Sequence, residues 1–269
     1  MQVEIVKEIE IEAVEEMRAK GDFSVSLSRT QALLARLPEA GTRIRLLFNV
    51  ICCSTQLERD DITRAASEEL DTLPNPELSR MFANMIRANT DNDLGRYREA
   101  ILLIDANLEL PCMDRDDSRI HRLDHFAVKG RALARLRQWD DALVWLTKAC
   151  SLYPDENAIT DPETSQHVRW RTTSILCDSA VTLMGLRRFD EAYNTAKQIL
   201  GRENGDFDVV ALHYMAATRL NEGRYSEAME IYQRLQAMLP SPLVDAAETR
   251  REMETCAREL QKSGQHRQS

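Results

Sequence analysis

One stretch, residues 126–154, constrains the fold of this chain most: FAVKGRALARLRQWDDALVWLTKACSLYP. Large and small apolar side chains recur in it at helical spacing. These positions are Phe126, Gly130 and Leu133 in the first half and Trp139, Ala142, Leu146 and Ala149 in the second. The small residues Gly130 and Ala142 let two helix axes approach closely, and Pro154 cannot continue a helix. The stretch therefore predicts two short amphipathic helices joined by a tight turn.

The same pattern recurs along the chain. An aromatic residue follows each clearly predicted turn, and a proline closes most of the second helices. The aromatic residues are Phe23, Tyr97, Trp139, Phe189 and Tyr225, and the prolines are Pro38, Pro111, Pro154 and Pro240. Glycine and proline are otherwise scarce, at 9 and 8 residues, which favours helices throughout. The sequence therefore predicts an all-α protein built from repeated helical hairpins.

The large, small and large positions of both helices, with the closing proline, resemble the tetratricopeptide repeat, a helix–turn–helix unit of roughly 34 residues. The resemblance implies a right-handed α-α superhelix, or solenoid, of about six hairpins plus a C-terminal capping helix. The expected organisation is two degenerate hairpins in 1–75 and four repeats within 76–262, at about 78–111, 118–154, 162–201 and 208–240. A capping helix at 243–262 and a disordered tail at 263–269 follow. The cap is expected because the last repeat would otherwise expose its apolar face.

Two regions depart from the regular pattern. The alternating run Ile9–Glu12 could form a strand, but the apolar stripe continues to Met17 at helical spacing, which favours a helix. The first helices of two repeats are predicted to be lengthened, over about 118–137 and 162–186. The loops at 112–118 and 155–161 carry the extra length.

Composition and charge narrow the functional classes. The formal net charge of −9 argues against nucleic-acid binding, which favours a basic surface. The longest apolar run, 46–53, is too short to span a bilayer, and the charged N-terminus has no signal-peptide core. The six cysteines form no CxxC pair. We therefore expect a cytoplasmic protein with no membrane and no nucleic-acid partner.

The sequence contains no recognisable catalytic set. His121 and His125 lie four residues apart near several aspartates, a spacing that can place two imidazoles on one metal ion. The segment lacks the glutamate of the HExxH motif, so exposed polar residues near a helix start are the favoured interpretation. Adjacent Cys52 and Cys53 could form a redox pair, but reduced thiols within helices fit their surroundings better. We expect no enzyme activity, no cofactor and no metal.

The resemblance also implies where a partner binds, because the first helices of successive repeats line a concave groove in this family. By register, the groove-facing candidates are Met85, Asn89, Asn92, Asp124, Ala127, Arg131, Arg135, Ser174, Cys177, Asp178, Val181, His213, Ala217 and Asn221. One subclass binds chaperone C-termini through Lys and Asn at such positions. Ala127, Cys177 and His213 stand where Lys would be needed, so we do not expect that clamp here.

The lengthened helices add a second candidate surface, rich in the Arg and Trp that dominate interface hot spots. They carry Arg119, Arg122, His125, His167, Arg169, Trp170 and Arg171. An alternative is that Trp170 packs inside and the arginines are only solvated. The predicted partner-binding residues are Asn89, Arg131, Arg135, Arg169, Trp170, Arg171, His213 and Asn221.

The leading functional prediction is a non-catalytic adaptor that binds a protein or peptide in its groove, and an acidic segment is one candidate partner. The alternative is a peptide- or ligand-responsive regulatory protein that acts on a separate effector. The sequence leaves homo-oligomerisation open.

Overall fold

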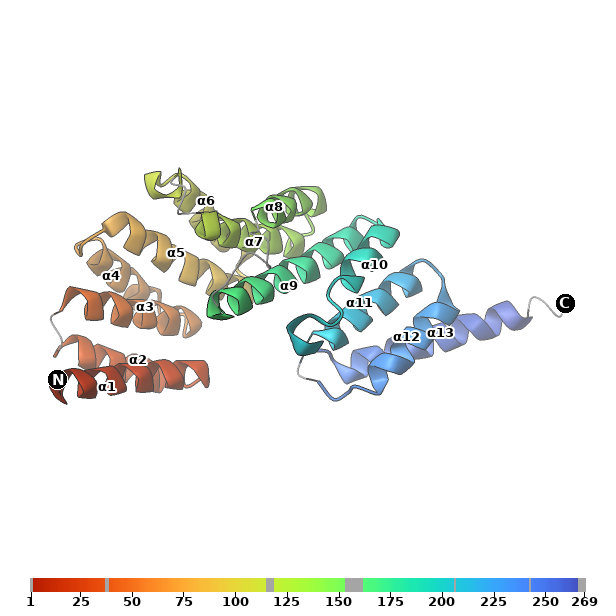
Figure 1. Ribbon diagram of the computed structural model, residues 1–269, viewed down its shortest axis with the longest axis horizontal. Coiled ribbons are helices and arrows are strands. Elements are labelled where there is room, and N and C mark those ends of the chain that lie inside the picture. Colours follow the sequence, from red (N-terminus) through yellow and green to blue (C-terminus); the bar gives the residue numbers. More distant parts are fainter. Residues whose placement is uncertain are drawn as a thin grey trace. The chain divides into compact units, whose positions relative to one another are not determined.

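The computed structural model describes residues 2–36, 39–114, 119–152, 162–205, 207–241 and 243–265. In these residues the chain is all-α, and no strand is present among them. The predicted fold class, an all-α helical repeat, is therefore confirmed (Figure 1).

The helices follow one another in consecutive pairs, with one extra helix at the C-terminal end. They are α1 (Gln2–Ala19), α2 (Phe23–Leu34), α3 (Ala40–Gln56), α4 (Asp60–Leu70), α5 (Pro76–Asp93), α6 (Tyr97–Leu108), α7 (Arg119–Arg135), α8 (Trp139–Ser151), α9 (Pro162–Gly185), α10 (Phe189–Lys197), α11 (Asp208–Asn221), α12 (Tyr225–Gln236) and α13 (Ala246–Gln265). In the part of the chain that the structure describes, the short 3-10 helices η1 (Pro111–Asp114) and η4 (Arg202–Gly205) lie between them.

The chain divides into two compact units, Met1–Ala132 and Leu133–Ser269, and the boundary falls within α7. In the first unit, α3 packs against α2, α4 and α5, and α5 packs against α6. In the second, α9 packs against α8, α10 and α11, and α12 packs against α11 and α13. Each unit is thus a stack in which a helix contacts both its hairpin partner and its counterpart in the next hairpin.

The turns inside the hairpins share one backbone feature. A residue with positive φ stands two positions before the first residue of each second helix. The six residues are Gly21, Glu58, Gly95, Arg137, Arg187 and Gly223. Glycine adopts this left-handed conformation without steric cost, whereas the three other side chains are strained in it. The sequence pattern identified the glycine turns, but it did not show that Glu58, Arg137 and Arg187 adopt the same conformation.

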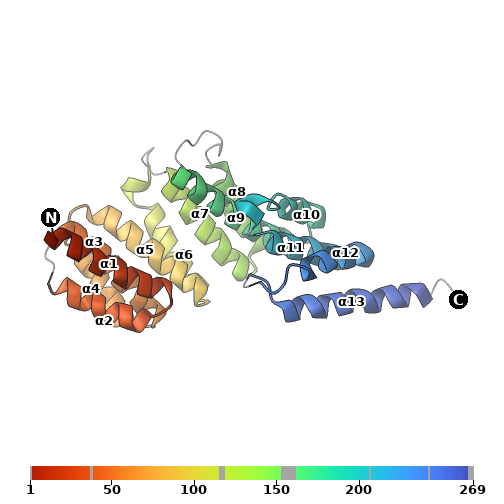
Figure 2. The ribbon, with the colours of Figure 1, turned by 60° about the horizontal axis from the view of Figure 1, so that its bottom comes forward.

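Each unit has its own apolar core. In the first, Leu47, Ile51 and Leu70 are fully buried between α3 and α4. In the second, the fully buried Tyr232 and Leu235 of α12 pack with Ala216 of α11 and Cys256 of α13. Because Cys256 belongs to this cluster, α13 covers the apolar face of the last hairpin. Figure 2 shows α13 following α12 at the C-terminal end of the chain.

The described helices refine several expectations. Ile9–Glu12 lies inside α1, which confirms a helix at that segment. Pro76 is the first residue of α5, where its missing N–H costs nothing. α13 continues to Gln265, so the first residues of the expected tail are helical, and 266–269 lie outside the described residues.

Some predicted features cannot be placed. Pro38 and Pro154 lie outside the described residues, as does most of the loops at 112–118 and 155–161. No helix within the described ranges has the length and apolar content needed to cross a membrane.

Candidate partner-binding site

The N-terminal part of α9 carries exposed candidate side chains of the C-terminal unit. Trp170 is 43% exposed, and the Arg171 guanidinium lies 4.9 Å from the centre of its ring. That distance is within cation–π range. Arg169 is also exposed, while neighbouring Val168 and Thr173 are buried and hold this helix against its unit. Trp170 therefore does not pack inside the protein, contrary to the alternative considered from the sequence.

Arg135 does not join this surface. It is exposed at the end of α7, four residues before Trp139. The Trp139 ring packs against Gly185 at the C-terminal end of α9, so closely that a Cβ on Gly185 would lie 2.5 Å from the ring. Trp170 stands 15 residues before Gly185 on α9, which at 1.5 Å per residue is roughly 22 Å along the helix axis. Arg135 and Trp170 thus lie near opposite ends of α9.

His213 of α11 is engaged by the capping helix. Its Nδ1 atom lies 3.6 Å from the Glu252 carboxylate of α13, and its ring lies 5.8 Å from that of Tyr214. Burial raises the pKa of Glu252, and the nearby imidazole opposes that shift. Burial also raises the pKa of Tyr232, whose hydroxyl faces Glu252. His213 therefore lies against α13, and the candidate at the end of α11, Asn221, is exposed with its amide donating to the Ala217 carbonyl at 2.7 Å.

In the N-terminal unit, the prediction that Asn89 and Asn92 face a groove is only partly correct. Asn89 is half-buried, and its amide donates to the Met85 carbonyl at 3.0 Å. Asn92 is buried and donates to the Val128 carbonyl of α7 at 3.2 Å, so it joins two helices and does not face a groove. Burial raises the pKa of Asp93, and the guanidinium of Arg131 on α7 opposes this shift.

Two further candidates from the sequence, Ala127 and Ala217, are buried. The side chains of Arg119 and His167 lie outside what the structure describes. Arg122 donates to the Met113 carbonyl at 3.1 Å, so it ties α7 to η1. Of the surface expected along both lengthened helices, the structure therefore describes mainly the part on α9.

His125 was expected to be exposed, but it is 1% exposed inside the N-terminal unit. Its Nδ1 donates to the His121 carbonyl at 2.6 Å, and its Nε2 lies 2.8 Å from the Asn107 amide nitrogen. That amide also donates to the Met81 carbonyl at 2.8 Å. Because Nε2 accepts from an amide donor, the ring is held neutral, and burial lowers its pKa to about 4.

These contacts occupy both ring nitrogens of His125, so neither is available to a metal ion. Asp116 and Asp117 lie outside the described residues, and the described ranges contain no group of three or more metal-ligating side chains. Cys52 and Cys53 are reduced thiols, and burial raises the pKa of each, which disfavours the reactive thiolate.

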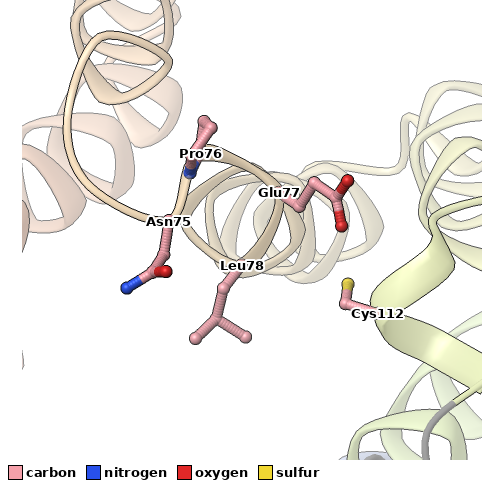
Figure 3. Close-up of a pocket in the computed structure, with 5 residues that line it drawn as sticks. All are labelled: Asn75, Pro76, Glu77, Leu78 and Cys112. Atoms are coloured by element: carbon pink, nitrogen blue, oxygen red, sulfur yellow. The ribbon is translucent and has the colours of Figure 1, made fainter.

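A pocket of about 320 Å³ lies at the start of α5 (Figure 3). Pro76, Glu77 and Leu78 line it from the start of α5, Asn75 lines it from the position just before that helix, and Cys112 lines it from η1. Cys112 faces Glu77 across the pocket (Figure 3). These two groups are the titratable side chains of the lining, and neither belongs to the partner-binding residues predicted from the sequence.

Sequence reasoning missed a second, charged cavity among α4, α5 and α6. Asp91 and Arg96 meet inside it, with an Arg96 Nη2 to Asp91 Oδ1 distance of 2.7 Å. The available clue was the position of Asp91, four residues before the turn glycine Gly95, where three of the other turns have Met17, Leu133 and Leu183.

Comparison with solved structures identifies the fold. TTC0263, a thermophilic TPR protein in Thermus thermophilus, matches with a TM-score of 0.52 and 15% identity, over 80% of this chain and 99% of that chain. A tetratricopeptide repeat protein from Parabacteroides merdae matches with a TM-score of 0.44 and 10% identity, over 93% and 98% of the two chains. The TPR2AB domain of yeast Sti1, solved in a pHSP90 complex, gives a TM-score of 0.40 and 12% identity, over 94% and 98%. No family model matches the chain, and no curated protein matches it.

The stacked helical hairpins, the left-handed turns and the capping helix define an α-helical repeat protein. Together with the match to TTC0263, they show that the chain has the tetratricopeptide-repeat fold predicted from its sequence.

Proposed function

We propose that this protein is a non-catalytic scaffold that binds a partner protein or peptide through the first helices of its repeats. The observation that carries the proposal is Trp170, a large aromatic side chain that is 43% exposed and flanked by two arginines. Leaving such a side chain in water forgoes favourable burial, and Trp and Arg are enriched among the residues that dominate binding energy.

The same residues indicate the chemistry of the partner. Arg171 places a guanidinium group 4.9 Å from the centre of the Trp170 ring, and the exposed Arg169 directly precedes Trp170, on a chain whose net charge is −9. Guanidinium groups pair well with carboxylates, and the ring offers an apolar face next to them. The favoured partner is therefore an acidic segment with an apolar side chain. A chain with a net charge of −9 repels such a segment in general, whereas these arginines attract it.

The remaining candidate residues for partner binding have different roles in the proposal. Arg135 and Asn221 are exposed and available to extend the surface toward the turns of the C-terminal unit. Asn89 and Arg131 form a separate candidate surface on the N-terminal unit. His213 already contacts Glu252 of α13. We therefore propose that His213 affects partner binding through α13 and not by direct contact.

The division into two degenerate repeats in 1–75 and four repeats with a cap in 76–262 is part of the same proposal. So are a cytoplasmic location, the absence of enzyme activity and the absence of a cofactor. A scaffold role fits a chain in which the buried His125 and the adjacent Cys52 and Cys53 serve packing and hydrogen bonding.

Affinity capture with a matched pair of variants tests the proposal. The test variant is Arg169→Glu/Trp170→Ala. The control is Arg234→Glu/Met238→Ala, because Arg234 is exposed on α12 and Met238 is also 43% exposed. Both variants remove one exposed apolar side chain and reverse one charge.

We expect the test variant to recover much less of a partner that the wild type and the control variant both capture. Equal recovery by all three proteins would refute the assignment of the surface. Thermal melting of the two variants, which should agree with that of the wild type, excludes a loss caused by unfolding.

A further inference from the structure

The contact face of α13 is narrow and has a carboxylate at its centre. Thr249, Glu252 and Cys256 stand three and four residues apart, so they lie on one face of the helix. Between residues 246 and 262 of α13, only Thr249 and Cys256 are buried. Few apolar side chains therefore hold α13 against the last hairpin, and Glu252 stands where an apolar residue would strengthen the contact.

Glu252 meets a polar side chain of each helix that α13 contacts. Its Oε2 atom lies 3.6 Å from Nδ1 of His213 on α11, a distance too long for a hydrogen bond. The Tyr232 hydroxyl of α12 faces the same carboxylate. These three atoms are buried, and none of them has a hydrogen-bond partner within the described residues. Because buried polar atoms without partners cost stability, this contact between three helices is weaker than an apolar one.

The charge of Glu252 is poorly compensated in the docked helix. The titratable or charged groups that face it are His213 of α11, Tyr232 of α12, and Glu248, Arg251 and Cys256 of α13. Glu248 and Arg251 are exposed and opposite in charge, so together they contribute little. Burial raises the pKa of Glu252, and His213, Tyr232 and Arg251 oppose this shift without cancelling it. The ionised carboxylate is therefore less stable in the docked helix than in water.

α13 has a helix cap of its own, independent of α11 and α12. The Asp245 carboxylate accepts from the Ala247 N–H at 2.8 Å, and the Asp245 carbonyl accepts from the Thr249 hydroxyl at 3.1 Å. Such bonds stabilise the first turn of a helix from within its own chain segment. α13 is therefore able to separate from the hairpin without losing the bonds that begin it.

We infer that α13 is a pH-sensitive latch, which stays docked on the last hairpin while Glu252 carries a proton and is released when Glu252 gives that proton to the solvent. Release exposes Tyr232 and Leu235, which are fully buried under the docked helix. It also frees His213 from its contact with Glu252. The latch does not depend on the α9 surface of the proposed function.

Proton linkage determines the direction of the pH effect. In the released helix the Glu252 carboxyl is in water and has its ordinary pKa of 4.5, whereas docking raises that pKa. Above pH 4.5 the docked state therefore binds more proton than the released state, and docking weakens as the pH rises through the raised pKa. Between the two pKa values, the docking equilibrium falls by up to about tenfold per pH unit.

Hydrogen exchange of the full chain, resolved by mass spectrometry to individual helices, tests the latch at pH 5 and pH 8. Wild type is compared with Glu252→Gln and Glu254→Gln at each pH, so that the intrinsic pH dependence of exchange cancels. Glu252→Gln keeps the size of the side chain and cannot ionise. Glu254→Gln is the matched control, because Glu254 is exposed on the same helix.

We expect the α13 exchange rate of wild type, divided by that of Glu252→Gln, to rise at least about threefold from pH 5 to pH 8. Glu254→Gln should follow wild type, and α12 should stay protected in all three proteins. An unchanged ratio would overturn the latch. An equal rise in α11, α12 and α13 would also overturn it, because the whole hairpin would then be unfolding.

Glu252→Leu is a second variant in case the amide of Glu252→Gln disturbs the buried cluster. It places an apolar side chain at the centre of the contact face, so α13 should stay docked at both pH values. If Glu252→Leu shows the same rise in α13 exchange as wild type, Glu252 does not control the helix and the inference is wrong.

Discussion

The buried His125 makes the stability of the N-terminal unit depend on pH. Its pKa falls from 6.5 in the unfolded chain to about 4 in the folded protein, mainly because burial disfavours the charged ring. Protonation of Nε2 would also place a donor against the Asn107 amide, which already donates to it at 2.8 Å. Between these two pKa values the unfolded chain binds the proton and the folded chain does not. Stability is therefore lost as the pH falls from 6.5 toward 4.

The size of the effect follows from the two pKa values. One pH unit between them is worth about 1.4 kcal/mol. Going from pH 7 to pH 5 should therefore lower the free energy of unfolding by about 2 kcal/mol through His125 alone. Replacement by Gln removes the titrating ring, so His125→Gln should lack this part of the pH dependence, although it also costs stability at pH 7 through the altered hydrogen bonds.

Urea unfolding at pH 7 and pH 5, followed by circular dichroism, measures the effect. His121→Gln is the control, because it removes a histidine from the same helix and keeps the carbonyl that accepts from His125. The three tryptophans lie in the C-terminal unit, so their fluorescence follows that unit separately. If wild type and His125→Gln lose the same stability between the two pH values, the neutral buried ring is refuted.

Other predictions concern the C-terminal unit and the turns. Gly185→Ala should destabilise the protein by about 1–3 kcal/mol through overpacking against Trp139, and thermal melting should show this cost disappearing in the Trp139→Ala background. Arg187→Gly should stabilise the protein by about 1 kcal/mol, because it relieves the strain of a non-glycine residue in the left-handed conformation. As a control, Arg98→Gly within α6 should cost about 1 kcal/mol. If chemical denaturation ranks the two variants in another order, the strain argument is contradicted. Because burial raises the pKa of Glu252, its contribution to stability should be present at low pH and lost as the pH rises through the folded pKa, so tryptophan-monitored unfolding of Glu252→Gln should lack that dependence.

Much of the fold could be predicted from the sequence because its packing is local and periodic. The glycine turns at Gly95 and Gly223 and the aromatic residues after them mark each hairpin directly. The left-handed conformation of Arg137 and Arg187 could not be predicted from residue type, because packing of the flanking helices imposes it against the preference of the side chain. Likewise, the packing role of Gly185 depends on Trp139, which lies 46 positions away in the sequence.

The candidate surface was harder to predict than the fold. Register alone assigned Asn92 to a groove, but its amide reaches the Val128 carbonyl of the next first helix. Register also left His125 at an exposed helix start, because the partner that buries it, Asn107, comes from another helix. Polar residues of this kind depend on contacts between hairpins, and those contacts have no periodic signature in the sequence.

Hydrogen exchange of the full chain with and without its purified partner tests the central claim most directly. If the protein is a scaffold that docks its partner on the first helices, amides in the N-terminal turns of α9, around Trp170, should exchange more slowly in the complex. Protection confined to the second helices α8, α10 and α12, with unchanged exchange in α9, would contradict the account.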